Sequence, residues 1–164
     1  MSGLVLVDYN VGNLSSVRNA FRAVGYEVTV TADPGLIAEA DGLVLPGVGA
    51  YAACMANLKE VSLVEPVLGY ARSGRPLLGI CVGHQLLFEA GLEFGRTPGL
   101  GLLPGVVSAL PDSVKLPQIG WNLVEPVQKE HPIFAGLTDP YYAYFVHTYA
   151  VEGAEPGHVA ATTE

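Results

Sequence analysis

The residue with the clearest capacity for chemistry is Cys81, in the stretch GICVG at residues 79–83. A glycine two residues to each side of a nucleophile is typical of a sharp turn from a strand into a helix, which raises the side chain above a sheet. Unpaired N–H groups at the helix start would favour the thiolate, and the N–H of Val82 would be free to bind an oxyanion. The alternative is a small cysteine buried in the core.

A second glycine-rich segment could complete an oxyanion site. VLPGVGAY, at residues 44–51, leaves an apolar run through a proline and two glycines. A peptide between glycines can turn its N–H toward a neighbouring site, so Val48 and Gly49 are candidates for a second oxyanion donor. The alternative is an ordinary turn between a strand and a helix, and the Lys-Ser/Thr pair of a phosphate-binding loop is missing. Cys54 lies among alanines in a helix-like stretch, and we predict that it packs in the core.

Strands and helices that would position these two loops alternate through the first half of the chain. Near-continuous apolar runs predict buried strands, and the stretches between them predict helices. Repeated strand–helix–strand units imply a parallel sheet with helices on both faces. We therefore expect an α/β fold of three layers, flavodoxin-like in arrangement. Strands are expected at 4–9, 27–32, 42–47 and 75–80, and helices at 13–25, 34–40, 50–73 with a break near Pro66, and 82–91.

The second half of the chain has a different character after about residue 94. Glycine and proline become frequent, and short apolar runs between turns predict further strands in the segments 105–110, 114–127, 141–152 and 158–164. We expect these strands to be antiparallel additions to one edge of the parallel sheet. No linker or repeat interrupts the sequence, so residues 1–164 are expected to form a single domain.

Composition and charge narrow the classes of function. The chain has 164 residues, half of them hydrophobic, with 8 Lys and Arg against 16 Asp and Glu. Its net charge of −8 disfavours nucleic acid as a partner. No apolar run approaches the roughly 20 residues of a membrane span, and two cysteines make no disulfide framework. We expect a cytoplasmic protein without a metal or a cofactor.

Several segments resemble a known family. VDYNVGNLSSVRNAF, LPGVGAY and GICVGHQLLFE are similar to the class I, or triad, glutamine amidotransferases. Together with LPQIGWN at 116–122 and YYAYFVHTYAV at 141–151, they resemble, within that family, the glutaminase subunits of imidazole glycerol phosphate synthase, the histidine-biosynthesis enzyme. The resemblance runs across essentially the whole chain.

The resemblance implies a reaction and a partner. Cys81 would attack the side-chain amide of glutamine, N–H groups of Val82 and of Val48 or Gly49 would hold the oxyanion, and water would hydrolyse the thioester to glutamate. Ammonia would pass into a (β/α)₈-barrel cyclase subunit, so the assembly would be a heterodimer. The positions that would bind glutamine are Gly47, Gln85, His147, Thr148 and Tyr149, and those on the interface side are Asn13, Pro117, Gln118 and Trp121. Tryptophan alone is compatible with a core or an interface position, and the resemblance favours the interface.

The general base is the missing part of this expectation. The family triad takes its histidine and glutamate from a His-Pro-Glu type motif, which this sequence lacks. Four histidines, His84, His131, His147 and His158, are the alternatives, and none has the setting of a triad histidine. We therefore expect the triad His and Glu to lie outside residues 1–164, and the C-terminus to be truncated relative to the family. Other class I amidotransferases, serving pyridoxal phosphate or anthranilate synthesis, a cysteine hydrolase, and a catalytically dead interaction domain remain alternatives.

Overall fold

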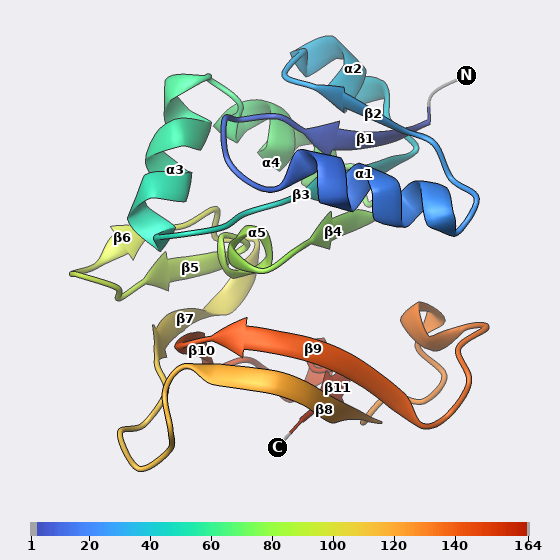
Figure 1. Ribbon diagram of the computed structural model, residues 1–164. Coiled ribbons are helices and arrows are strands. Elements are labelled where there is room, and N and C mark those ends of the chain that lie inside the picture. The colour runs from blue at the N-terminus through green and yellow to red at the C-terminus, as the bar shows by residue number, and fades with distance from the viewer. Residues whose placement is uncertain (1–2, 164) are drawn as a thin grey trace.

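A parallel sheet of four strands forms the centre of the first half of the chain (Figure 1). The computed structural model describes residues 3–163. The sheet order is β2-β1-β3-β4, which is the flavodoxin-like order expected from the alternating pattern. The strands are β1 (Leu4–Val7), β2 (Val28–Thr31), β3 (Gly42–Leu45) and β4 (Leu77–Gly79).

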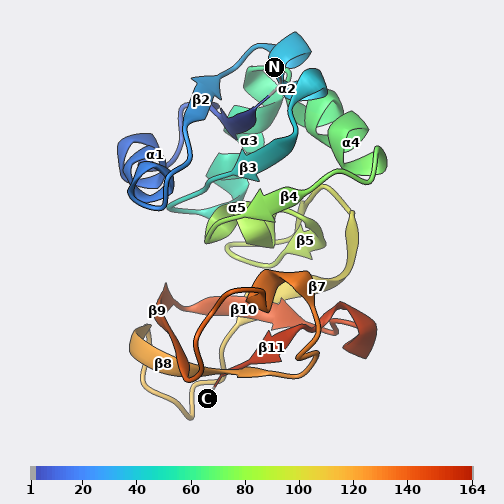
Figure 2. The ribbon, with the colours of Figure 1, turned by 90° about the vertical axis from the view of Figure 1, so that its right-hand side faces the viewer.

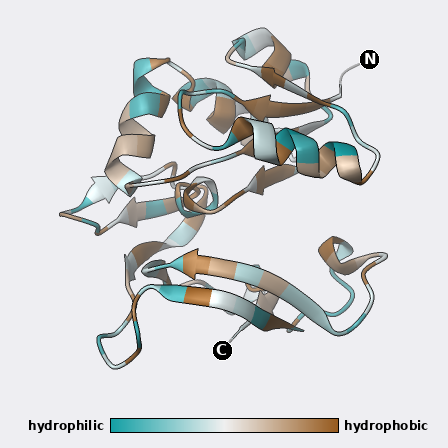
Figure 3. Cartoon of the chain, viewed as in Figure 1, coloured by the Kyte–Doolittle hydropathy of each residue, from teal (hydrophilic) through white to brown (hydrophobic). Residues whose placement is uncertain are grey.

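Helices cover both faces of this sheet, as predicted (Figure 2). On β1, Val5 and Val7 contribute to the large core beneath α2, α3 and α4, whereas Leu6 points to the smaller cluster beneath α1. Figure 3 shows β1 as strongly hydrophobic, and β3 has the sequence GLVL with all four residues buried, which is typical of strands buried on both faces. The helices are α1 (Leu14–Ala23), α2 (Pro34–Glu39), α3 (Tyr51–Glu60) and α4 (Val64–Arg72).

The break in the predicted helix at 50–73 comes earlier than Pro66. The chain leaves α3 at Val61, Ser62 takes a left-handed φ of 58°, and α4 begins at Val64. Pro66 is therefore a first-turn residue of α4. The first N–H groups of a helix have no partner within it, so a proline there removes no hydrogen bond.

The prediction of a helix over 82–91 was wrong. The helix α5 (Val82–Gln85) is a single turn, and the chain then extends into β5 (Phe88–Gly91). Backbone carbonyls that a longer helix would have used accept hydrogen bonds from the distant segment 99–103: Leu86 from Leu100, and Leu87 from Leu102 and Leu103. Long-range pairing has replaced the helix.

The second half of the chain builds two further sheets. One has the order β10-β7-β5-β6, in which β5 and β7 are parallel, and the other is the antiparallel sheet β11-β8-β9. Antiparallel additions were predicted, but they do not extend the edge of the parallel sheet as expected. The elements are β6 (Thr97–Pro98), β7 (Leu103–Ala109), β8 (Gln118–Pro126), η1 (Pro132–Phe134), β9 (Tyr141–His147), β10 (Tyr149–Glu152), η2 (Pro156–His158) and β11 (Ala161–Thr162). Within residues 3–163, no helix has both the length and the apolar character required to cross a membrane.

Candidate active site

Cys81 occupies a strained turn between β4 and α5. Its φ of 54° and ψ of −121° lie in a region that residues with a side chain rarely adopt. The turn is held on its strand side by the hydrogen bond from Ile80 N to Leu45 O at 3.0 Å, and on its helix side by that from His84 N to Cys81 O at 3.0 Å. Strain of this kind persists only where the surrounding structure enforces it, and it is characteristic of functional sites. Cys81 is exposed, which excludes the alternative of a buried core cysteine.

The glycines that flank Cys81 are required by close packing. A Cβ on Gly79 would lie 2.4 Å from the Cα of His84, and one on Gly83 would lie 2.0 Å from the carbonyl oxygen of Leu45. Carbon atoms do not approach other backbone atoms so closely without displacing them. The two glycines of GICVG are therefore needed because the turn packs tightly over the end of β3.

The loop of residues 46–49 lies directly against this turn. A Cβ on Gly47 would come within 2.4 Å of the backbone nitrogen of Gly83. Gly49 has a left-handed φ of +85°, and Val48 between them is half exposed, at 52%. The two glycine-rich segments singled out in the sequence thus meet at one edge of the sheet, at the carboxyl ends of β3 and β4, where ligands bind in open α/β sheets.

Three backbone N–H groups near Cys81 are free for a ligand. In the described part of the chain, the N–H groups of Val48, Gly49 and Val82 donate no hydrogen bond to another protein group. The helix α5 has four residues, too few for a substantial macrodipole, so any stabilisation of a thiolate or an oxyanion comes from these individual N–H groups. The expectation that a helix dipole would stabilise a Cys81 thiolate is therefore weakened, whereas the part that rests on unpaired N–H groups remains.

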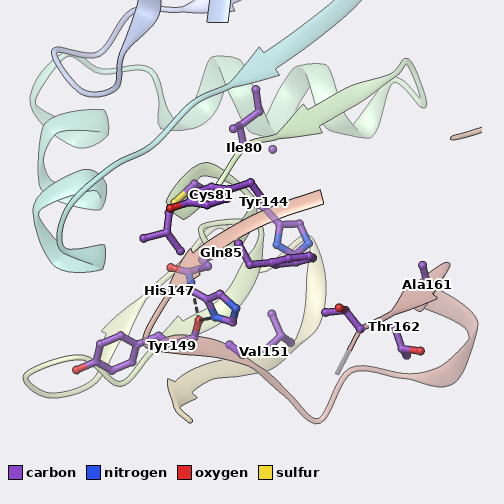
Figure 4. Close-up of a pocket in the computed structure, with 15 residues that line it drawn as sticks. Ile80, Cys81, Gln85, Tyr144, His147, Tyr149, Val151, Ala161 and Thr162 are labelled. Atoms are coloured by element: carbon purple, nitrogen blue, oxygen red, sulfur yellow. Dashed lines mark hydrogen bonds between the residues drawn. The ribbon is translucent and has the colours of Figure 1, made fainter. Parts of the chain in front are cut away.

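A pocket of about 700 Å³ opens beside Cys81 (Figure 4). Its wall is formed by the turn and α5 on one side and by the β9–β10 segment and β11 on the other. Among the predicted substrate-binding residues, Gln85, His147 and Tyr149 line the pocket. Thr148 and Gly47 are not among the lining residues; the Thr148 carbonyl accepts a hydrogen bond from Leu110 N at 2.9 Å.

Gln85 and His147 converge on one carbonyl oxygen (Figure 4). Gln85 Nε2 donates to the Tyr149 carbonyl at 3.1 Å, and His147 Nδ1 lies 3.1 Å from the same oxygen. Because a carbonyl can only accept, His147 Nδ1 carries a proton in this contact. These contacts tie α5 to the β9–β10 segment across the pocket.

Two of the four histidines share the pocket with Cys81. His84 lines it next to the turn, with its ring edge-on to Phe88 at 5.2 Å between centroids. The His84 side chain is exposed to the pocket, and partial desolvation by the surrounding protein lowers its pKa. His131 accepts a hydrogen bond from Ile133 N at 3.2 Å, His158 lies 4.0 Å from Glu155, and neither lines the pocket. Within residues 3–163, no hydrogen bond joins the Cys81 sulfur to a histidine.

The predicted interface residues lie on two elements. Asn13 is the N-cap of α1, where its side-chain oxygen accepts from Ser16 N at 3.1 Å. Gln118 and Trp121 belong to β8, with exposed Pro117 just before it. Trp121 is 71% exposed, so it is not packed in the core that the described residues form.

Trp121 is part of a larger apolar surface that the sequence did not reveal. Partly buried and exposed side chains alternate along the antiparallel pair β8–β9, so one face of this ribbon is open. The Trp121 and Tyr144 rings pack edge-on at 5.7 Å. Both faces of the ribbon carry apolar residues, so alternation alone could not identify the exposed one. The open face comprises Ile119, Trp121, Leu123, Tyr142, Tyr144 and Val146.

Two buried residues beneath the 46–49 loop were also missed. Tyr9 was given no role from sequence, and Cys54 was predicted only to pack. Both are fully buried, as expected for Cys54, but each also makes a hydrogen bond to the loop. No local pattern could signal these bonds, because they depend on how separate elements meet in the fold.

The comparison with known families decides the relationship. The family described as glutamine amidotransferase class-I matches residues 5–164. The chain belongs to the class-I glutamine amidotransferases. In this family context, the strained cysteine, the unpaired N–H groups and the pocket occupy one site.

Curated relatives of this amidotransferase are similar over its whole length. It is 58% identical to imidazole glycerol phosphate synthase subunit HisH of Symbiobacterium thermophilum, over 100% of this chain and 77% of that protein. It is 46% identical to the protein of the same name in Syntrophotalea carbinolica, over 98% of this chain and 81% of the relative.

Solved structures support the fold. A structure described as a glutamine amidotransferase superposes with a TM-score of 0.74 at 19% identity, over 96% of this chain and 78% of that one. A putative GMP synthase protein from Thermoplasma acidophilum gives a TM-score of 0.67 at 22% identity, over 99% and 73% of the two chains. At these identities the likeness concerns the fold alone.

Proposed function

We propose that this amidotransferase is the glutaminase subunit of an imidazole glycerol phosphate synthase. It hydrolyses glutamine to glutamate and ammonia, and the ammonia is used by a cyclase subunit in histidine biosynthesis. The observation that carries the proposal is the strained, exposed Cys81 beside unpaired backbone N–H groups. The 58% identity to a HisH subunit favours this member of the family over the other amidotransferases.

The reaction follows from the groups around the cysteine. The Cys81 sulfur attacks the side-chain amide carbon of glutamine, and the carbonyl becomes a tetrahedral oxyanion. The N–H of Val82 and that of Val48 or Gly49 hold the oxyanion. The carbon–nitrogen bond then breaks as the nitrogen takes up a proton and leaves as ammonia, and water hydrolyses the thioester to glutamate. Glutamine would lie along Gln85, His147 and Tyr149, which line the pocket, whereas Gly47 and Thr148, also expected from sequence to bind it, lie outside that lining.

We place the general base outside residues 1–164. His147 uses Nδ1 for the Tyr149 carbonyl together with Gln85, an arrangement suited to shaping the pocket. His84 packs against Phe88 and has no carboxylate partner to orient it in the described residues. A triad histidine requires both contact with the nucleophile and an orienting group. His147 has an orienting carbonyl but no hydrogen bond to Cys81 in the described residues, and His84 has neither. The triad His and Glu would then come from other parts of the complete gene product.

The partner we propose is a (β/α)₈-barrel cyclase bound as a heterodimer. The open face of the β8–β9 ribbon supports this, because Tyr144 and Val146 belong to it and also line the Cys81 pocket. A partner on this face would sit next to the site where ammonia is released. Asn13, Pro117, Gln118 and Trp121 would lie on the interface side. Residues 1–164 would act as a single domain, in the cytoplasm.

Glutamine hydrolysis measured with the cyclase partner tests the function. The complete gene product should release glutamate, and Cys81→Ala should abolish that release. Residues 1–164 alone should be slower by about 10²–10⁴-fold, the usual share of general acid–base catalysis. Full activity in residues 1–164 would contradict the external base. Capture of a different synthase, with no activity beside the cyclase, would contradict the assignment to histidine biosynthesis.

A further inference from the structure

We propose that Tyr9 and Cys54 are positioning residues for the oxyanion site: their side chains hold the carbonyls of Pro46 and Val48 and thereby aim the N–H groups of the 46–49 loop. This inference rests on the glutaminase proposed above. It assigns a role to two buried polar side chains that the reaction itself does not use.

The Tyr9 side chain reaches the loop from the end of β1. Tyr9 is fully buried, two residues past Val7, and its hydroxyl donates a hydrogen bond to the carbonyl of Pro46. β1 is hydrogen-bonded to β3, the strand that leads into the loop. Burial, together with the nearby cysteines Cys54 and Cys81, raises the pKa of Tyr9, so its hydroxyl stays protonated and remains a donor.

Cys54 holds the other end of the loop from α3. Its side chain is fully buried, and Sγ donates to the carbonyl of Val48 at 3.3 Å. Burial raises the pKa of the Cys54 thiol, so this group also keeps its proton and its donor character. The two donors belong to the same cluster of buried core residues.

Holding these two carbonyls fixes the direction of the N–H groups that follow them. In a trans peptide the C=O and N–H bonds point in opposite directions. The Val48 carbonyl faces the buried Cys54, so the N–H of Gly49 faces away from the core. The Pro46 carbonyl faces Tyr9, so the peptide that carries the Val48 N–H is flanked on both sides by peptides held in place.

The loop needs such anchors because its own residues do not restrain it. It contains two glycines, Gly49 has a left-handed backbone, and the N–H groups of Val48 and Gly49 make no protein hydrogen bond in the described residues. Oxyanion stabilisation depends on donors that are already aimed before the charge develops. Tyr9 and Cys54 supply this restraint from the core side and leave the outer side free for substrate.

The test compares two tyrosines that make the same kind of bond. Tyr9→Phe removes one hydroxyl from the complete gene product, assayed with its cyclase partner. We expect kcat for glutamine hydrolysis to fall about tenfold or more while KM changes less than about twofold, because the oxyanion exists only past the ground state. Tyr70→Phe is the matched control. Tyr70 is equally buried and its hydroxyl donates to the Pro76 carbonyl at 3.0 Å, before β4 and away from the loop.

Both tyrosine variants should lower the midpoint of urea unfolding by similar amounts, and only Tyr9→Phe should lower kcat. An equal kcat in the two variants, or a Tyr9→Phe defect confined to KM, would overturn the role of Tyr9. Cys81→Ala in the same assay separates the two hypotheses. If Cys81→Ala remains active, the proposed function fails; if it is inactive while Tyr9→Phe matches Tyr70→Phe, only the positioning role fails.

Substitutions of Cys54 test the positioning role independently, and they remain informative if Tyr9→Phe does not fold. Cys54→Ala removes the donor and should lower kcat by about tenfold. Cys54→Ser keeps a donor of similar size and should restore kcat to within about threefold of the unsubstituted protein. Equal kcat in the alanine and serine variants would show that Cys54 acts through packing alone.

Discussion

At the scale of single residues, the glycines of the turn are the most demanding positions. Gly83→Ala would place a Cβ 2.0 Å from the Leu45 carbonyl oxygen, and both groups belong to backbone that cannot move without distorting the turn. We expect this substitution to lower the free energy of unfolding by about 2 kcal/mol or more and to abolish glutamine hydrolysis. Urea unfolding and the glutaminase assay measure the two effects.

Gly69→Ala provides the matched control for this prediction. Gly69 is an exposed residue inside α4, and a Cβ there meets nothing within 4 Å. Because glycine disfavours a helix, alanine should raise the free energy of unfolding by about 0.5–1 kcal/mol. If Gly83→Ala were as well tolerated as Gly69→Ala, the close packing described for the turn would be wrong.

His84 should make stability depend on pH. Desolvation lowers its pKa below the ordinary 6.5, so between that lowered value and pH 6.5 the unfolded chain binds more protons than the folded one. The contribution of His84 is complete above pH 6.5 and is lost as the pH falls through this window. His84→Gln should therefore show a smaller drop in urea midpoint between pH 7.5 and pH 5 than the unsubstituted protein. An unchanged drop would mean that other groups cause it.

The geometry of the turn at Cys81 was predictable from sequence because it is local. Cys81 and Val82 follow from the glycine spacing of the turn, which fixes the backbone whatever else surrounds it. The hydrogen bonds of Tyr9 and Cys54 were not predictable, because their partners lie 37 and 6 residues away and depend on how β1 and α3 meet the loop. A buried tyrosine in sequence looks the same whether or not its hydroxyl has a partner.

At the scale of elements, the strands of the parallel sheet were predictable and the boundaries after the turn were not. The apolar runs of β1 and β3 have a single interpretation because both faces of each strand are buried. The run from Leu86 to Gly91 fits a helix and a strand equally well. Its structure is decided by hydrogen bonds from residues 99–103, which no local pattern contains.

The N-cap of α1 gives a prediction at this scale. The Asn13 side chain accepts from Ser16 N, and the first turn of α1 has no acidic residue. Asn13→Ala should lower the free energy of unfolding by about 1 kcal/mol. Asn13→Asp keeps an acceptor at a favourable helix end and should be close to neutral. Urea unfolding measures both, and equal losses in the two variants would show that the cap is not what stabilises α1.

These two variants also separate the cap from the proposed interface. Asn13→Asp retains the fold while it changes the charge of the exposed side chain. If Asn13 contacts the cyclase, Asn13→Asp should weaken binding of the partner without a change in stability. The two roles of Asn13 can therefore be measured one at a time.

At the scale of the whole molecule, the sequence predicted a flavodoxin-like parallel sheet covered by helices, but not how the second half is placed. Its strands pair with one another into two more sheets and leave the β8–β9 ribbon open on one face. That face depends on which side of the ribbon meets the rest of the protein. Because apolar residues occur on both sides of β8 and β9, the sequence could not show which side is exposed. The three-dimensional packing determines it.

The open face of the ribbon leads to a prediction about assembly. Trp121 is 71% exposed at its centre and packs on Tyr144. Tryptophans in such positions dominate binding energies, with losses of about 2 kcal/mol or more on truncation. Trp121→Ala should therefore raise the Kd for the cyclase about 30-fold or more, while the urea midpoint stays nearly unchanged because the side chain contributes little to the core. Isothermal calorimetry or surface plasmon resonance measures the Kd.

Phe94→Ala is the matched control, since Phe94 is 92% exposed in the turn between β5 and β6, outside the ribbon. Loss of an exposed aromatic there should leave the Kd unchanged. If both variants bind equally well, the open face is not the cyclase surface. The supporting result is that Trp121→Ala binds the cyclase weakly while its urea midpoint equals that of the unsubstituted protein. The face that lines the Cys81 pocket would then also be the face through which the two subunits meet, so ammonia would be released directly beside the partner.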